Sequence, residues 1–271
     1  MFLLGCSIGN AQPTRALAEA DSLAVVGLFQ KASVEYERVL FLDGALESEV
    51  LLKKAQCQKR LGYFRDAIYT LKRIPTLDIS DTLRCRILYE TSLCMYLAGQ
   101  GEKAWRTLMQ ARGSVADSSL CQDQEYLEVV IAAETEQWTN ARLAAQRYAQ
   151  RRGLQIEIDT LEMFKDPTGI CDVEAAERLS ALLPGLGMIY VGEVKDGLVS
   201  LLFQSAFVVV AVERYVTHHI IAAVGIGANL TLAFHQGGVR HTRYLAERAN
   251  ARVLRQKKEA IKEWVLSYER N

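Results

Sequence analysis

Leu61-Gly62-Tyr63-Phe64-Arg65-Asp66-Ala67-Ile68 is the clearest copy of a pattern that occurs four times in the first 150 residues. The copies begin at Gly27, Gly62, Gly99 and Glu136, and each has an alanine five positions later, at Ala32, Ala67, Ala104 and Ala141. These alanines are 35, 37 and 37 residues apart. A period of this length indicates helical units that stack and share one continuous core.

Residues at fixed distances from each alanine support this periodicity. Small residues stand twelve positions before it, at Ala20, Ala55 and Ser92, with Val129 in the fourth copy. Four positions after it come Tyr36, Leu71, Leu108 and Ala145. We expect two helices to touch at the small positions and the next helix to pack at the later ones.

The register resembles the tetratricopeptide repeat, a helix–turn–helix unit with glycine, an aromatic residue and alanine around its turn. The resemblance covers about residues 13–150, although Gly101 replaces the turn aromatic in the third copy and Glu136 replaces the glycine in the fourth. It implies an all-α, right-handed superhelix with a concave face. An unrelated helical bundle is the alternative.

If the resemblance holds, the first helix of each repeat lines the concave face and binds a protein or peptide partner. The candidate peptide-binding residues are Gln56, Lys59, Arg60, Tyr89, Tyr96 and Tyr126. Tyrosines beside a basic pair suit an extended peptide, because they offer stacking area and a charge for a carboxylate. Alternatively, the tyrosines cover the seam between repeats. The lysine and asparagine clamp of chaperone-binding repeats is missing, so no particular peptide end is implied.

Composition excludes several classes of protein. The 271 residues are 50% apolar, and 32 basic side chains balance 32 acidic ones. This argues against a disordered chain, a collagen-like polymer and a general nucleic-acid binder. Gly185-x-Gly187 lacks the spacing of a dinucleotide loop, and no GxSxG, Walker or HExxH motif occurs. We therefore expect a protein that is not an enzyme and has no cofactor.

The first twelve residues resemble the end of a secretory signal. Gly9 and Ala11 are the small residues that signal peptidase needs before Gln12. Leu3-Leu4-Gly5-Cys6 also fits the lipobox of bacterial lipoproteins, and a frayed apolar terminus is a third reading. Export is the leading prediction, with the repeats outside the inner membrane of a bacterial envelope.

The six cysteines form no CxxC pair and no zinc-like grouping, so no metal site is predicted. We expect them to be buried, reduced thiols. Cys57 and Cys94 occupy equivalent positions of neighbouring repeats, and helices roughly 8–10 Å apart are too distant for a disulfide. The histidines, His218, His219, His235 and His241, are expected to have no ligand role.

The chain changes character after the repeats. Arg151-Arg152-Gly153 ends the last repeat helix, Asp166-Pro167-Thr168-Gly169 reads as a linker, and Asp172 can cap a helix that Pro184-Gly185 terminates. The following segment resembles the Pro-Gly-x-Gly-x-x-Tyr-x-Gly signature of small two-helix bacterial membrane domains, over about residues 180–250. The matching residues are Pro184, Gly185, Gly187, Tyr190, Gly192 and Gly197, whereas Met188 stands where members usually have glutamine.

Two charge-free runs, Leu198 to Val212 and Ile220 to Phe234, have 15 residues each. At 1.5 Å per residue each gives about 22 Å of helix, less than the ~30 Å of a hydrocarbon layer. Their pairing across a short polar hinge and the small-residue face of Ala223-x-x-x-Gly227 favour a membrane hairpin over a buried soluble one. Gln204 and Asn229 would hydrogen-bond across it or mark a polar pathway.

The last segment reads as a basic amphipathic helix, which suits either an anionic lipid surface or a solvated site beside the repeats. Exported repeats and two crossings leave this basic tail outside, against the positive-inside tendency. A third crossing by Leu179 to Gly192 would remove the conflict, but Pro184 breaks that segment. We retain two crossings.

These observations predict five parts, namely a leader at 1–12, repeats at 13–152, a linker at 153–171, the motif and hairpin at 172–238, and the basic helix at 239–271. The expected function is a non-catalytic scaffold that is anchored in the membrane and binds a partner through its repeats. The alternative is an accessory subunit of a membrane transport or protein-insertion assembly, in which the hairpin is the functional part.

Overall fold

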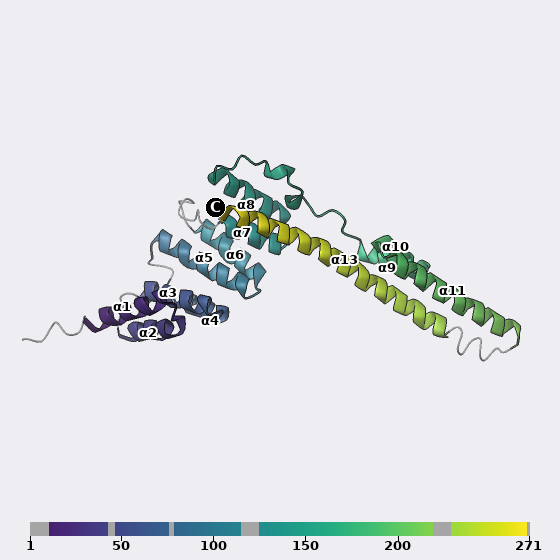
Figure 1. Ribbon diagram of the computed structural model, residues 1–271, viewed down its shortest axis with the longest axis horizontal. Coiled ribbons are helices and arrows are strands. Elements are labelled where there is room, and N and C mark those ends of the chain that lie inside the picture. Colours follow the sequence, from purple (N-terminus) through teal and green to yellow (C-terminus); the bar gives the residue numbers. More distant parts are fainter. Residues whose placement is uncertain (1–10, 43–46, 76–78, 115–124, 219–228, 270–271) are drawn as a thin grey trace, which may run out of the picture. The chain divides into compact units, whose positions relative to one another are not determined.

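The computed structural model describes residues 11–42, 47–75, 79–114, 125–218 and 229–269 (Figure 1). This part of the chain is all-helical, with 83% of residues in helices, 12 α-helices and no strand. The all-α prediction is therefore confirmed at this level. Several predicted features lie outside the described residues, namely the leader up to residue 10, Cys6, Cys121, His219, and the Ala223 and Gly227 face.

The chain divides into two compact units. The first comprises residues 1–165 and 264–271, and the second comprises residues 166–263. The boundary at 165/166 falls inside the expected linker. The C-terminal helix α13 (Asn229–Glu269) belongs to both units, and it runs without a break across the boundary expected at residue 238.

The first unit consists of four helix pairs in which each helix packs mainly against its neighbours in sequence. The pairs are α1 (Ala11–Val25) with α2 (Phe29–Leu42), α3 (Glu47–Arg60) with α4 (Phe64–Lys72), α5 (Asp81–Leu97) with α6 (Gly101–Gly113), and α7 (Glu125–Glu134) with α8 (Trp138–Arg151). Two short 3₁₀ turns, η2 (Ile158–Thr160) and η3 (Glu162–Phe164), follow.

One turn geometry recurs within all four pairs. Gly27, Gly62, Gly99 and Glu136 have positive φ angles of 84°, 80°, 75° and 61°. The next backbone N–H then donates to the carbonyl five residues earlier, as from Tyr63 to Gln58 at 2.9 Å and from Gln137 to Ala132 at 2.8 Å. This pattern closes a helix with a left-handed residue, for which glycine is best suited. Glu136 adopts the same geometry at a steric cost.

The predicted contact positions are buried. Ala32, Ala67, Ala104 and Ala141 have no exposed surface, and the residues twelve positions earlier are at most 2% exposed. The residues four positions after each alanine are buried as well. The repeating sequence pattern thus marks the places where helices of the first unit touch.

The prediction of buried, reduced cysteines is confirmed at two positions and wrong at Cys85, and Cys171 is free as expected but only half-buried. Cys57 and Cys94 are buried and free. Burial raises the pKa of the Cys94 thiol to about 11, so it stays protonated at neutral pH. Cys85, which was expected to be reduced, is disulfide-bonded. The spacing of cysteines along a sequence does not reveal which pairs meet in space.

The C-terminal residues of α13 pack within the first unit. The Trp264 ring makes edge contacts with Tyr148 of α8 and with Phe164 of η3, at centroid distances of 5.8 and 5.2 Å. Glu269 accepts a hydrogen bond from the Tyr148 hydroxyl and pairs with Arg152. The end of the basic helix therefore contacts the repeats, which was one of its two expected locations.

The second unit contains α9 (Val173–Leu182), α10 (Leu186–Val191), α11 (Val194–Val216) and most of α13. Asp172 caps α9 as predicted, because its side chain accepts bonds from the N–H groups of Glu174 and Ala175. A break at 183–185 separates α9 from α10, so Leu179 to Gly192 is not one continuous crossing helix.

Replacing Ala67 with leucine tests the contact positions of the first unit. We expect Ala67→Leu to lower the free energy of unfolding by about 1–3 kcal/mol, because the added carbons meet a filled helix contact. Denaturation of the full chain in detergent, followed by circular dichroism, measures this change. Tyr69→Leu is the control, since Tyr69 is exposed two residues further along the same helix. Equal stability of the two variants would contradict the register.

Candidate functional site

Polar contacts connect the first helices of neighbouring pairs. Lys53 of α3 pairs with Asp21 of α1 at 2.8 Å. Lys59, also on α3, pairs with the buried Glu90 of α5, which accepts a further hydrogen bond from Gln56 at 3.1 Å. The predicted site residues Gln56 and Lys59 are thus brought together, but the Lys59 charge is already matched by Glu90.

The predicted tyrosines lie further along the same series of helices. Tyr89 of α5 and Tyr126 of α7 contact each other through their hydroxyls, and their rings meet edge-on with centroids 6.3 Å apart. Tyr96 is half-buried against the core of the first unit. Tyr89 and Tyr126 therefore bridge two helix pairs, as the seam interpretation expects, while part of each ring stays exposed.

Exposed cations complete this surface. Arg60 is exposed at the end of α3, on the same face as Gln56 four residues earlier. Arg86 is exposed on α5 and shares a face with Tyr89 and Glu90. Sequence reasoning missed Arg86, although its position three residues before a candidate tyrosine could have shown it. We call Gln56, Lys59, Arg60, Arg86, Tyr89, Glu90 and Tyr126 the tyrosine–arginine face.

A cluster of charges around two buried glutamates connects helices α6, α7 and α8. Glu128 of α7 pairs with Arg112 of α6 and Arg147 of α8, at 3.1 and 2.6 Å, and Glu125 pairs with Arg151 at 3.1 Å. Burial raises the pKa of the Glu125 carboxyl, and the Arg151 charge opposes the rise. Breaking such pairs is costly because a buried charge is left without its partner. This cluster joins three helices, and its glutamates are buried whereas its arginines are about one-third exposed.

The Pro-Gly motif of the second unit forms a corner in which backbones approach closely. Gly185 has a φ angle of 82°, and a Cβ atom there would lie 2.1 Å from the Gly197 carbonyl oxygen of α11. A Cβ at Gly187 would lie 1.9 Å from the Ala176 carbonyl oxygen of α9. Glycine is required at these positions because no other residue fits.

The remaining motif residues lie around this corner. Gly192 ends α10 with a φ angle of 99°, while Tyr190 is exposed and Pro184 sits in the break before α10. The Ser180 and Thr242 hydroxyls hydrogen-bond across α9 and α13 at 2.7 Å. Asn250 of α13 exchanges two hydrogen bonds with the Cys171 backbone. The glycines of the motif therefore let the helices of the second unit pack closely.

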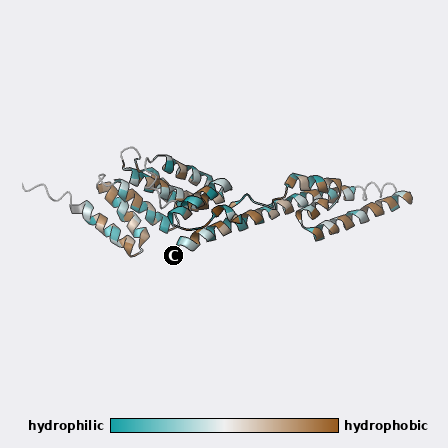
Figure 2. Cartoon of the chain, turned by 90° about the horizontal axis from the view of Figure 1, so that it is seen from above, coloured by the Kyte–Doolittle hydropathy of each residue, from teal (hydrophilic) through white to brown (hydrophobic). Residues whose placement is uncertain are grey.

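Helix α11 has an inverted distribution of polarity. Its buried residues are Gly197, Ser200 and Gln204, which share one face. Large apolar side chains such as Leu202 and Val209 are 69% and 66% exposed. Brown, apolar residues predominate along this helix (Figure 2). Among the described residues, α11 alone is long and apolar enough to cross a membrane, and 17% of its apolar stretch is buried.

An open apolar groove with a volume of 520 Å³ lies between α10, α11 and α13. Its walls include Met188, Val199 and Phe203 on one side and Leu230 and Phe234 on the other. Asp196 and His241 lie among its lining residues, as do Ser200 and Gly238. No sequence pattern predicted this groove, because it depends on which faces of α11 and α13 meet.

Gln204 lies beside the groove and was expected to hydrogen-bond across the hairpin. It is 5% exposed, and its Nε2 atom has no hydrogen-bond partner in the described structure. A Cβ at Gly238 would lie 4.0 Å from this nitrogen and 3.6 Å from the Ser200 hydroxyl. The expected hydrogen bond from this nitrogen is therefore not formed.

Metal-binding chemistry has no support in the part of the chain that the structure covers. No three His, Cys, Asp or Glu side chains gather there in a way that could hold an ion. His241 stacks on Tyr244, with ring centroids 6.2 Å apart.

Comparison of the sequence with models of protein families and with curated proteins, and a search of solved structures, gave no match.

Replacing Gly187 with alanine tests the glycine corner. We expect a loss of more than about 3 kcal/mol in the free energy of unfolding, since backbone, Ser180 and Thr242 surround the added methyl group. Thermal unfolding of the full chain in detergent measures it. Gly237→Ala is the matched control, because nothing lies within 4 Å of its Cβ position, and alanine favours a helix by up to about 1 kcal/mol. A stable Gly187→Ala protein would refute the close packing.

Proposed function

We propose that this protein is a membrane-anchored, non-catalytic scaffold whose tetratricopeptide-like repeats bind a protein partner. The observation that carries the proposal is the inverted polarity of α11, which exposes its large apolar side chains. The four helix pairs of the same chain bury such side chains in a core. The repeated left-handed turns and buried alanines of the first unit support the tetratricopeptide resemblance. The proposed superhelix would present the tyrosine–arginine face to the partner.

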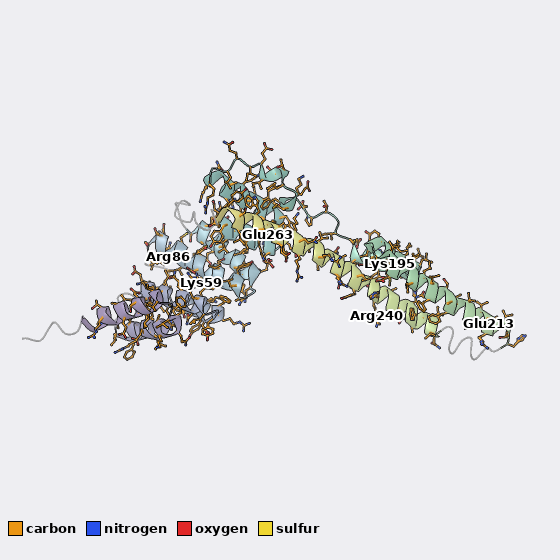
Figure 3. All side chains as sticks on the ribbon, viewed as in Figure 1. Lys59, Arg86, Lys195, Glu213, Arg240 and Glu263 are labelled. Carbon is orange, nitrogen blue, oxygen red and sulfur yellow. The ribbon has the colours of Figure 1, made fainter. Side chains whose placement is uncertain are left out.

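The anchor rests on the length and surface of α11. Its 23 residues give about 34 Å of helix, which exceeds the ~30 Å hydrocarbon layer. Lys195 and Glu213 lie toward opposite ends of it (Figure 3), and the intervening residues from Gly197 to Val212 carry no charge. Small residues on the buried face suit the close packing of membrane helices. These features support insertion of α11 into lipid.

Export of the repeats is supported by chemistry within them. The disulfide at Cys85 favours an oxidising compartment, because disulfides are rare where thiols are kept reduced. The resemblance of the first residues to a secretory leader points the same way. The proposal therefore assigns the repeats to the outer side of a bacterial inner membrane.

The proposed partner surface consists of side chains that are not already paired within the fold. Lys59 is occupied by Glu90, whereas the guanidinium groups of Arg60 and Arg86 have no ion pair among the described residues. The exposed parts of Tyr89 and Tyr126 lie on the same series of helices. Arginine and tyrosine are enriched at the energetically important centres of protein interfaces. We therefore propose a partner segment with carboxylates and apolar side chains.

Lysine substitutions on the exposed face of α11 test the anchor. In water, Leu202→Lys with Val209→Lys would be tolerated, because both positions are exposed. In lipid each lysine costs about 2.5–3.5 kcal/mol near the helix centre. We expect the double variant to leave the carbonate-washed membrane fraction, where the unmodified chain remains. Phe41→Lys, at a 90% exposed position of α2, is the control and should stay there. Carbonate extraction of the unmodified chain would contradict the anchor.

Charge reversal at the two arginines tests the partner surface. We expect Arg60→Glu with Arg86→Glu to reduce partner recovery at least tenfold in a quantitative pull-down in mild detergent, without a change in melting temperature. Arg65→Glu with Arg106→Glu controls for net charge, because both arginines are exposed on the second helix of their pairs. If the double variant keeps its partners while replacement of the α11 segment removes them, recognition lies in the membrane segment. The transport or insertion alternative would then replace the scaffold.

A further inference from the structure

The groove of the second unit has the size and lining of a site for a hydrocarbon chain. Its 520 Å³ falls within the ~300–1,000 Å³ of ordinary ligand pockets. One turn of a helix about 10 Å wide and 5.4 Å high occupies about 420 Å³. A membrane helix of several turns therefore exceeds the groove, whereas a single flexible chain fits along it, beside the Phe203 and Phe234 rings, whose centroids are 6.2 Å apart.

Gln204 supplies an independent sign of a ligand. Its side chain is more than nine-tenths buried, and its Nε2 atom lacks an acceptor in the described structure. A buried amide donor without a partner costs free energy, and water is scarce within a bilayer. Gly238, which lines the groove, has no side chain to separate it from this nitrogen. A ligand carbonyl oxygen in the groove would satisfy the donor.

Two cations lie on the helices that form the groove, each next in sequence to one of its lining residues. Lys195 and Arg240 are exposed, and both lie away from the Glu213 end of α11 in Figure 3. Neither has an ion pair within the described structure. Asp196 contributes one opposing charge, so the three groups sum to one positive charge.

From this arrangement we propose that the groove binds one acyl chain of a membrane phospholipid. The ester carbonyl accepts a hydrogen bond from Gln204 Nε2, the chain lies along the Phe203 and Phe234 rings, and the phosphate is on the side of Lys195 and Arg240. The lipid thereby fills the space between α11 and α13 and stabilises their antiparallel contact. The inference rests on the proposed insertion of α11 into the membrane.

Photocrosslinking tests the site on the full chain. The protein is reconstituted into vesicles of phosphatidylethanolamine and phosphatidylglycerol that contain a phosphatidylcholine with a diazirine in one acyl chain. After irradiation, peptide mass spectrometry maps the labelled residues. We expect labelling concentrated at groove residues of α11 and α13, over a lower background on lipid-facing positions such as Leu202 and Val209.

Two variants at neighbouring positions provide the critical comparison. Ala233→Trp fills the groove, whereas Leu232→Trp adds the same ring one residue earlier, at an exposed position outside the lining. We expect groove labelling to fall at least fivefold in the first and to remain in the second. Gln204→Leu removes the hydrogen-bond donor. We expect it to weaken binding of the lipid in the groove roughly three- to tenfold, as for the loss of a hydrogen bond between membrane helices.

The outcomes separate this inference from the proposed function. Membrane retention of the unmodified chain reports on the anchor alone. If the chain is retained but labelling is uniform over α11, or unchanged by Ala233→Trp, the lipid site is wrong and the anchor stands. Crosslinks from the groove to another protein would also overturn the proposed lipid site. If the chain does not insert, both proposals fail.

Discussion

Close approach of helices at small residues is the constraint on which both units depend. In the first unit, alanines with no exposed surface recur at each helix pair, and a larger side chain there would push the pair apart. In the second unit the approach is closer, since Gly185 and Gly187 leave no room even for a methyl group. The helices of the first unit thus meet through small side chains, whereas those of the second unit meet through their backbones.

This constraint explains which features were predictable. A small residue at a helix contact recurs with the period of the structure, so the alanine positions and the turns at Gly62 and its equivalents were visible in the sequence. The Asp172 cap and the break at Pro184 depend on local chemistry and were equally accessible. The glycine motif was recognised, although its backbone contacts with Ala176 and Gly197 follow only from the arrangement of three helices.

The chemistry of the candidate site was less predictable, because it depends on contacts between distant residues. Lys59 reads as a free cation in the sequence, but Glu90 lies 31 residues further on and neutralises it. Arg60, one residue later, has no such partner among the described residues and is the better candidate. The disulfide at Cys85 and the unpaired amide of Gln204 likewise depend on spatial neighbours. Residue type and spacing therefore predicted most residues of the tyrosine–arginine face, but not which of its side chains are already paired within the fold.

Helix α11 and the first unit follow opposite rules of burial, and this argues that one chain is built for two solvents. The first unit buries leucine, isoleucine and tyrosine, and its ion pairs are mostly at the surface. In the second unit, α11 buries glycine, serine and glutamine and exposes valine, leucine and phenylalanine, while Met188, Leu245 and Ile261 are buried on the other helices. In water that arrangement would lose the hydrophobic gain on which folding depends. In lipid it is favourable, because hydrocarbon surrounds the large side chains while small and polar groups join the helices. An unsatisfied amide beside an open apolar groove is then the point at which the surrounding lipid can enter the packing itself.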